Sequence, residues 1–110
     1  MNQDIIYDVY LMPGMAANPK IFEFIKLPSN FKVHHLEWQM PYKNELISEY
    51  ALRISRLIKG NNIVLIGVSF GGIIVQEISK IIKCKKVIII SSVKSNKELP
   101  LMMQIGKKTK

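Results

Sequence analysis

The residues of this chain best suited to chemistry form one short segment around Ser69. Gly67, Ser69 and Gly71 make a G-x-S-x-G pattern, which follows an apolar run at residues 62–66 and precedes an apolar segment at residues 73–82. The flanking runs predict a strand, a sharp turn and a helix. A serine on such a turn projects its hydroxyl out of the sheet, and the glycines leave room where side chains would collide with neighbouring elements. The pattern therefore indicates a serine nucleophile.

A backbone amide beside Ser69 is placed to stabilise the charge that forms when a hydroxyl attacks a carbonyl. The N–H of Phe70 is expected at the start of a helix, where the helix dipole favours an anion. The same terminus could hold a phosphate group instead. A dinucleotide fingerprint would need glycine in place of Ser69, and a Walker motif would need Gly-Lys-Ser or Gly-Lys-Thr, which the sequence lacks. We therefore prefer the catalytic interpretation over phosphate binding.

Strands and helices that position this turn are expected to alternate along the chain. They are predicted in turn at residues 5–11, 18–26, 31–36, 44–59, 63–66, 73–83 and 87–90. Strand–helix alternation with continuously apolar strands is typical of a parallel sheet with right-handed crossovers. The predicted fold class is α/β, a three-layer sandwich of about four parallel strands with helices on both faces. One domain is expected to cover residues 1–110, with residues 93–110 as a basic, weakly ordered tail.

Composition narrows the class of protein further. The chain has 110 residues and a net charge of +8, which suits one small domain. It has no run near the roughly 18 apolar residues of a membrane span. Asp4 and Asp8 stand where a signal peptide would be basic. Cys84 is the only cysteine, so no disulfide framework or cysteine-based zinc site is expected. We expect a cytoplasmic protein without a metal or cofactor.

The positive charge is concentrated in the last third of the chain. Nine lysines and one acid, Glu98, lie between Lys80 and Lys110. A basic segment can attract nucleic acid or anionic lipid, which would make the chain a binding protein for an acidic partner. Arginines and interleaved aromatic residues, on which nucleic-acid readout usually depends, are absent from this segment. We therefore expect a small-molecule acyl substrate as partner and interpret the lysines as a solvated surface.

These residues together resemble the α/β-hydrolase family, over nearly the whole chain but only the N-terminal part of a family domain. The segment from Gly67 to Gly71 resembles the nucleophile elbow, with Ser69 as the nucleophile. Residues 11–15, which contain Pro-Gly, are similar to the loop after an early family strand. The resemblance implies an oxyanion hole made by the backbone N–H groups of Met15 and Phe70. It also implies carboxylesterase-like hydrolysis of an ester, thioester or similar acyl bond.

The family places the acid and the histidine of its catalytic triad after the serine. In this chain the carboxylates after Ser69 are Glu77 and Glu98, and the only histidines, His34 and His35, precede it. Adjacent strand residues face opposite sides of a sheet, so at most one histidine could approach a site. We therefore expect a truncated hydrolase whose general base and acid come from outside these residues, and which is inactive or very weak alone.

A non-catalytic interpretation stays open. The strand that begins at Val87 and ends at Ile90 would form an apolar edge of the sheet, able to pair with a second copy or with a complementing chain. The chain would then be a remnant or an interaction module. Trp38, Met40 and Tyr42 follow the second predicted strand and could line the mouth of a pocket, although core packing explains them equally well.

Overall fold

A computed structural model describes residues 4–14 and 26–90 of the chain. Six elements follow in order: β1 (Tyr7–Met12), β2 (Phe31–His35), α1 (Ile47–Ser55), β3 (Ile63–Val68), α2 (Phe70–Ser79) and β4 (Lys86–Ile90). Met15, most of the helix predicted at residues 18–26 and the tail predicted at residues 93–110 lie outside the described residues. The structure therefore bears on the sheet and on the turn around Ser69.

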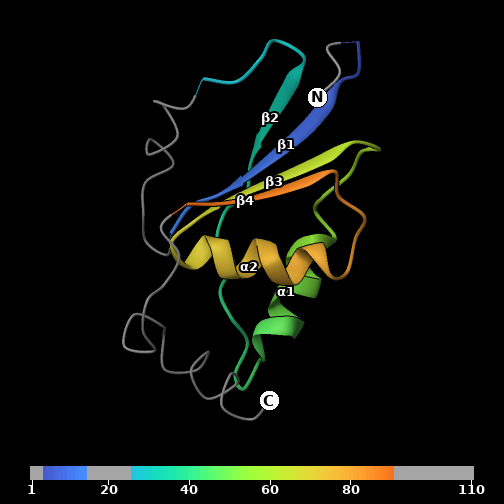
Figure 1. The fold of residues 1–110 in the computed structure, drawn as a ribbon. Coiled ribbons are helices and arrows are strands. Elements are labelled where there is room, and N and C mark those ends of the chain that lie inside the picture. Colours follow the sequence, from blue (N-terminus) through green and yellow to red (C-terminus); the bar gives the residue numbers. More distant parts are fainter. Residues whose placement is uncertain (1–3, 15–25, 91–110) are drawn as a thin grey trace.

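The four strands form one parallel sheet in the order β2-β1-β3-β4 (Figure 1). This confirms the predicted α/β class with four parallel strands, and each strand begins and ends within two residues of its predicted bounds. β3 is buried at all six positions. Its sequence shows no alternation of apolar and polar residues because both of its faces are covered.

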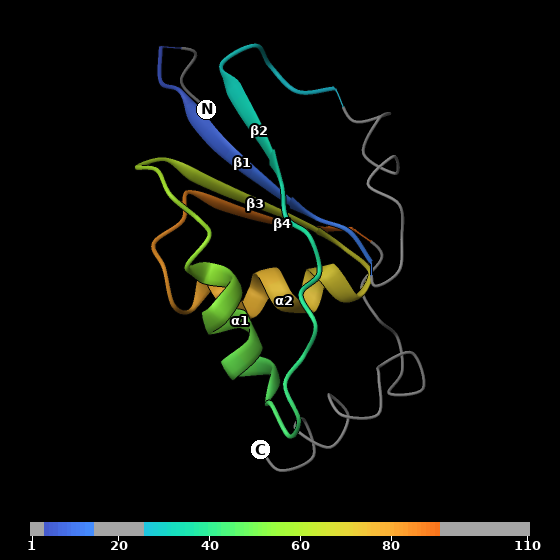
Figure 2. The ribbon, with the colours of Figure 1, turned by 180° about the vertical axis from the view of Figure 1, so that it is seen from behind.

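Helices α1 and α2 lie side by side on one face of the sheet (Figures 1 and 2). Apolar residues at helical spacing turn inward from both helices, among them the fully buried Tyr50, Ile54, Ile74 and Ile78. A second apolar cluster covers the opposite face of the sheet and includes Val9 and Val64. Both described helices cover one face only, and the third predicted helix, at residues 18–26, falls almost wholly in residues that the structure does not describe.

Both helices are shorter than the sequence predicted. Asn44 has a φ of 62°, so the helix expected from residue 44 cannot start there. α1 starts after Leu46, whose N–H donates to the Glu49 carboxylate at 2.8 Å. Its end comes early because the N–H groups of residues 56–58 donate to carbonyls three residues back, which tightens the last turn. The same change ends α2 at Ser79.

The sheet changes its direction of growth between β1 and β3. The chain leaves β1 for β2 on one side, then returns past β1 to form β3 on the other. Open parallel sheets bind ligands outside the carboxyl ends of their strands at such a point. Met12 and Gly67 are register partners at these carboxyl ends. The segments that follow β1 and β3, which contain Pro13 and Ser69, therefore meet at the place where this fold forms binding sites.

Candidate active site

Ser69 lies in a backbone conformation that serine rarely adopts. Between β3 and α2 it has a φ of 55° and a ψ of −123°. These angles match the first central position of a type II′ turn, where glycine dominates, and such a conformation costs of order 1–3 kcal/mol. Its N–H donates to the Ile90 carbonyl at 2.8 Å, and its own carbonyl accepts from the Gly72 N–H at 2.9 Å. Neighbouring elements thus hold the turn in place.

The hydroxyl of Ser69 does not form the helix-capping hydrogen bond that is usual for a serine at this position. Ser69 is the N-cap residue of α2, where a serine side chain ordinarily accepts a hydrogen bond from the second or third helical N–H. No such bond forms. The residue as a whole is half-buried. The local geometry therefore combines an unfavourable backbone with a hydroxyl that does not cap the helix.

Glycines on either side of Ser69 make this turn possible. A Cβ at Gly67 would collide with the Gly71 carbonyl oxygen, and a Cβ at Gly71 would collide with the Met12 carbonyl and come within 2.6 Å of the Pro13 carbonyl oxygen. These obstacles are backbone atoms that side-chain motion cannot relieve. The glycines of the G-x-S-x-G pattern therefore allow α2 to start directly against the end of β1, as the sequence predicted in general terms.

The backbone N–H of Phe70 begins α2 and has no acceptor within the helix. The Phe70 side chain is 3% exposed, so the residue is fixed in the core while its amide stands at the helix N-terminus. The second amide of the predicted oxyanion hole belongs to Met15, which lies outside the described residues. Pro13 and Gly14, which precede it, are buried at the end of β1.

Trp38 joins these two segments. Its indole Nε1–H donates to the Pro13 carbonyl at 2.9 Å. Its ring centroid lies 5.4 Å from that of Phe70 and 5.7 Å from that of Tyr50. From the sequence, Trp38 could either line a pocket or pack in the core. The structure shows it packed between the end of β1 and the start of α2. Met40 and Tyr42, considered with it, are 83% and 62% exposed.

The two histidines lie on β2, which is separated from β3 by β1. Two strand spacings correspond to roughly 10 Å across the sheet, too far for a hydrogen bond to Ser69. His34 is engaged elsewhere: its Nε2 lies 2.9 Å from the Asp8 carboxylate, and its ring stacks on Tyr10 with centroids 4.5 Å apart. The structure therefore does not bring either histidine to Ser69.

The acidic candidate within the described residues is engaged elsewhere. Glu77, on α2, accepts a hydrogen bond from the Lys80 ammonium group at 2.6 Å. Glu98 lies outside the described residues. Within residues 4–14 and 26–90, therefore, the predicted nucleophile and one predicted oxyanion amide come together without a triad base or acid.

A metal cluster, a membrane-spanning helix and a reactive thiol find no support in the described part of the chain. No three side chains among His, Cys, Asp and Glu gather there in a way that could hold a metal ion. Neither described helix is long and apolar enough to cross a membrane. Burial raises the pKa of the Cys84 thiol, which disfavours the reactive thiolate despite the nearby lysines.

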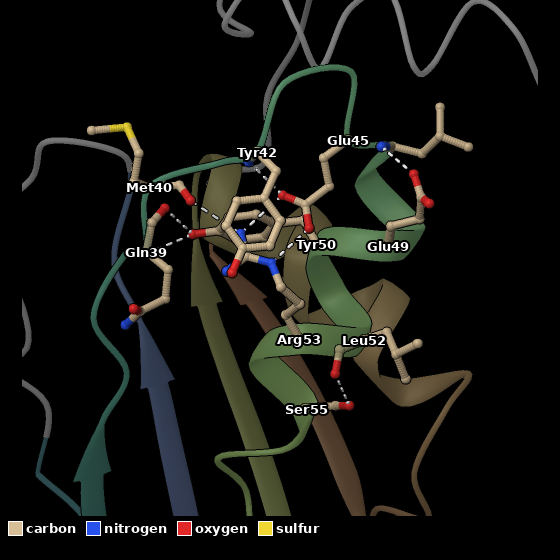
Figure 3. Close-up of polar contacts among 10 residues, drawn as sticks. Gln39, Met40, Tyr42, Glu45, Glu49, Tyr50, Leu52, Arg53 and Ser55 are labelled. Atoms are coloured by element: carbon tan, nitrogen blue, oxygen red, sulfur yellow. Dashed lines mark hydrogen bonds and ion pairs between the residues drawn. The ribbon is translucent and has the colours of Figure 1, made fainter.

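A polar network of different character joins α1 to the loop after β2 (Figure 3). The Arg53 guanidinium donates to the Glu45 carboxylate through Nε at 2.6 Å and Nη2 at 2.9 Å, and Nη2 also donates to the Met40 carbonyl at 3.1 Å. The Tyr42 N–H donates to Glu45 at 2.9 Å. The hydrogen bonds from Arg53 hold the pKa of the Glu45 carboxyl below its ordinary value. No pattern in the sequence indicated this network, because its members are spread over a loop and a helix.

Tyr50, a buried residue of α1, also connects this helix to the loop after β2. Its hydroxyl donates to the Gln39 carbonyl at 2.8 Å and accepts from the Gln39 N–H at 2.7 Å. Burial raises the pKa of Tyr50, so its hydroxyl stays protonated as a donor. The loop that carries Trp38 toward the candidate site is therefore fixed to α1 by several hydrogen bonds.

Comparisons of the chain with family models, with curated proteins and with solved structures found no match. Its function is consequently inferred from the geometry of the site itself.

Proposed function

We propose that this chain carries the nucleophile of a serine hydrolase that cleaves ester, thioester or similar acyl bonds. One observation carries the proposal: Ser69 sits at positive φ on a glycine-flanked turn between a buried strand and a helix, and its hydroxyl does not cap that helix. An observed backbone outlier of this kind is a reason to suspect function, because the surrounding structure must compensate its cost. The turn also lies where parallel sheets bind ligands.

The proposed reaction begins with attack of the Ser69 hydroxyl oxygen on the substrate carbonyl carbon. The carbonyl electron pair moves to its oxygen, and the Phe70 N–H donates a hydrogen bond to the resulting oxyanion. The N–H of Met15 is the second donor in this proposal. The serine proton passes to a general base, the alcohol or thiol leaves, and water then hydrolyses the acyl-serine ester.

The base is the part of the mechanism that the described residues do not supply. A serine hydroxyl is a poor nucleophile without an adjacent base. In the protease subtilisin, loss of the serine or the histidine from the complete triad lowers turnover by about 10⁶. We therefore propose that a base and its orienting acid come from another segment or molecule. The 110-residue chain alone should react slowly.

Imidazole in solution can stand in for that base and tests the proposal directly. The chain is incubated with p-nitrophenyl acetate with and without imidazole, and acetyl transfer to the protein is measured by mass spectrometry. After digestion we expect an acetyl ester on the peptide that carries residue 69, formed faster as imidazole is raised and absent from that peptide in Ser69→Ala, above a background of acetylated lysines that both proteins share. Ser79→Ala is the matched control, since the Ser79 hydroxyl donates to the Gln76 carbonyl at 2.6 Å. Equal acetyl occupancy of the peptide that carries residue 69 in wild type and in Ser69→Ala would refute the proposal.

A second candidate function rests on the edge of the sheet. Within the described residues β4 pairs with β3 alone, and Ile90 at its end is 38% exposed. An open strand edge can accept another strand. Under this alternative a second copy of the chain pairs with β4, and sedimentation velocity would show a dimer that dissociates on dilution. A monomer at all concentrations would reject pairing of copies.

A further inference from the structure

Trp38 touches both segments that form the candidate site. Its indole N–H holds the Pro13 carbonyl at the end of β1, and its ring packs against Phe70 at the start of α2. The sequence around Trp38 is itself fixed on either side. The Leu36 N–H donates to the Leu11 carbonyl at 2.9 Å, and Gln39 is held by the Tyr50 hydroxyl. Trp38 therefore reaches the site from a segment with little freedom to shift.

We propose that Trp38 is a positioning residue that sets the loop after β1 against the N-terminus of α2. The inference rests on the proposed function, because it assigns Trp38 to the same oxyanion site. The peptide unit between Pro13 and Gly14 is planar, so a hydrogen bond that fixes the Pro13 carbonyl also fixes the direction of the Gly14 N–H. That bond therefore sets the direction of the chain at Gly14, beside the start of α2.

Gly71, the other described neighbour of the Met12 and Pro13 carbonyls, does not supply the same constraint. Gly71 has no side chain, so the Met12 and Pro13 carbonyls can approach it closely. For the same reason it offers them no side-chain hydrogen bond. Pro13 is buried, and a buried carbonyl that loses its partner carries a desolvation cost. If the indole N–H is removed, the Pro13 carbonyl loses its donor, and we expect the loop to shift until that carbonyl accepts another hydrogen bond. Displacements of about 1 Å near reacting atoms can cost a hundredfold in rate.

The first test compares reaction rates at Ser69. Wild type, Trp38→Phe and the control Met40→Leu are treated with a fluorophosphonate in the presence of imidazole. The Ser69 oxygen forms a bond to phosphorus, the phosphorus–fluorine bond breaks, fluoride leaves, and imidazole takes the proton. Phenylalanine keeps an aromatic ring against Phe70 but has no N–H donor. We expect Trp38→Phe to lower the limiting rate by about tenfold to a hundredfold with little change in half-saturating reagent, and Met40→Leu to match wild type.

The second test needs no substitution at Trp38. Trp38 is the only tryptophan, so its indole N–H gives a single, unambiguous NMR signal. Modification of Ser69 should move that signal in wild type. The reagent should leave it in place in Ser69→Ala. A signal that stays unmoved on complete modification overturns the inference, and it does so even if Trp38→Phe fails to fold.

The outcomes separate the inference from the proposed function. If Ser69 reacts in wild type and Trp38→Phe reacts at the same rate, Trp38 is only a packing residue and the proposed function stands. If Ser69 of wild type does not react at all, the proposed function fails and the positioning role fails with it.

Discussion

Two regions of the molecule contrast in how their polar groups are used. In the network that joins α1 to the loop after β2, Glu45 and Arg53 form two hydrogen bonds with each other and further bonds to the backbone. At the turn between β3 and α2, Ser69 lies at positive φ and its hydroxyl leaves the helix uncapped. The first region satisfies its donors and acceptors internally, as a structural support does. The second maintains a costly conformation without the local hydrogen bond that serine normally gains.

The contrast indicates that the two ends of the loop that joins these regions have different roles, one structural and one at the candidate site. Residues 36–46 begin at the end of β2, pass Trp38 beside the candidate site, and end in the Glu45 network at the start of α1. The Glu45 network fixes one end of this loop to α1, and Trp38 packs beside the candidate site near the other end. Four predictions test this comparison.

The largest expected effect concerns two adjacent glycines. Gly71→Ala should destabilise the fold by about 3 kcal/mol or more, because the added Cβ meets the backbone of Met12 and Pro13. Gly72→Ala is the matched control. Its Cβ would come within 2.6 Å of Ile89 Cγ2, so Ile89 must shift, but the Cβ meets a side chain rather than backbone, and we expect a smaller loss of about 1–2 kcal/mol. Urea unfolding measures both, and equal losses would show that the turn is not closely packed on β1.

The network is tested by Glu45→Gln. The amide keeps the shape of the carboxylate but loses the charge-assisted bonds to Arg53, so the free energy of unfolding should fall by about 1–3 kcal/mol. Reaction of Ser69 with a fluorophosphonate should change much less than in Trp38→Phe. A stability equal to that of wild type would show that the network contributes nothing net.

The contribution of the same network to the free energy of unfolding should depend on pH. Because hydrogen bonds from Arg53 lower the pKa of folded Glu45 below 4.5, its contribution to stability is complete above that value and is lost as pH falls through the lower, folded-state pKa. The stability difference between wild type and Glu45→Gln should therefore be constant near neutral pH and shrink below about pH 4.5. A difference that grows on acidification would contradict the sign of this shift.

The smallest expected effect is a gain. Ser69→Gly relieves the positive φ, and we expect it to raise the free energy of unfolding by about 1 kcal/mol while it abolishes reaction at residue 69. Ser69→Ala abolishes the reaction too, yet keeps the Cβ and should leave stability near that of wild type. A Ser69→Gly variant less stable than Ser69→Ala would argue that the backbone at this turn is unstrained.

Much of the fold could be predicted from the sequence because β3 and most of β4 are short apolar runs, and because Gly, Pro and Asn residues mark breaks between the elements. The order of the strands in the sheet, with β1 beside β3, depends on pairing between distant segments and needed the structure. At the site, the G-x-S-x-G spacing predicted the turn, and the glycines do meet backbone atoms as expected. The hydrogen bond from Trp38 to Pro13 joins residues 25 positions apart, and no local pattern announces it.

The central claim is that the backbone at Ser69 presents a reactive hydroxyl. The most direct measurement treats the chain with p-nitrophenyl acetate and imidazole, digests it, and compares acetyl occupancy at Ser69 with occupancy at Ser79, a serine whose hydroxyl is hydrogen-bonded to its own helix. We predict that acetylation of Ser69 exceeds that of Ser79 by at least about tenfold, a part of the roughly hundredfold or more that one positioned oxyanion donor contributes in an enzyme. Equal occupancy at the two serines would contradict the account.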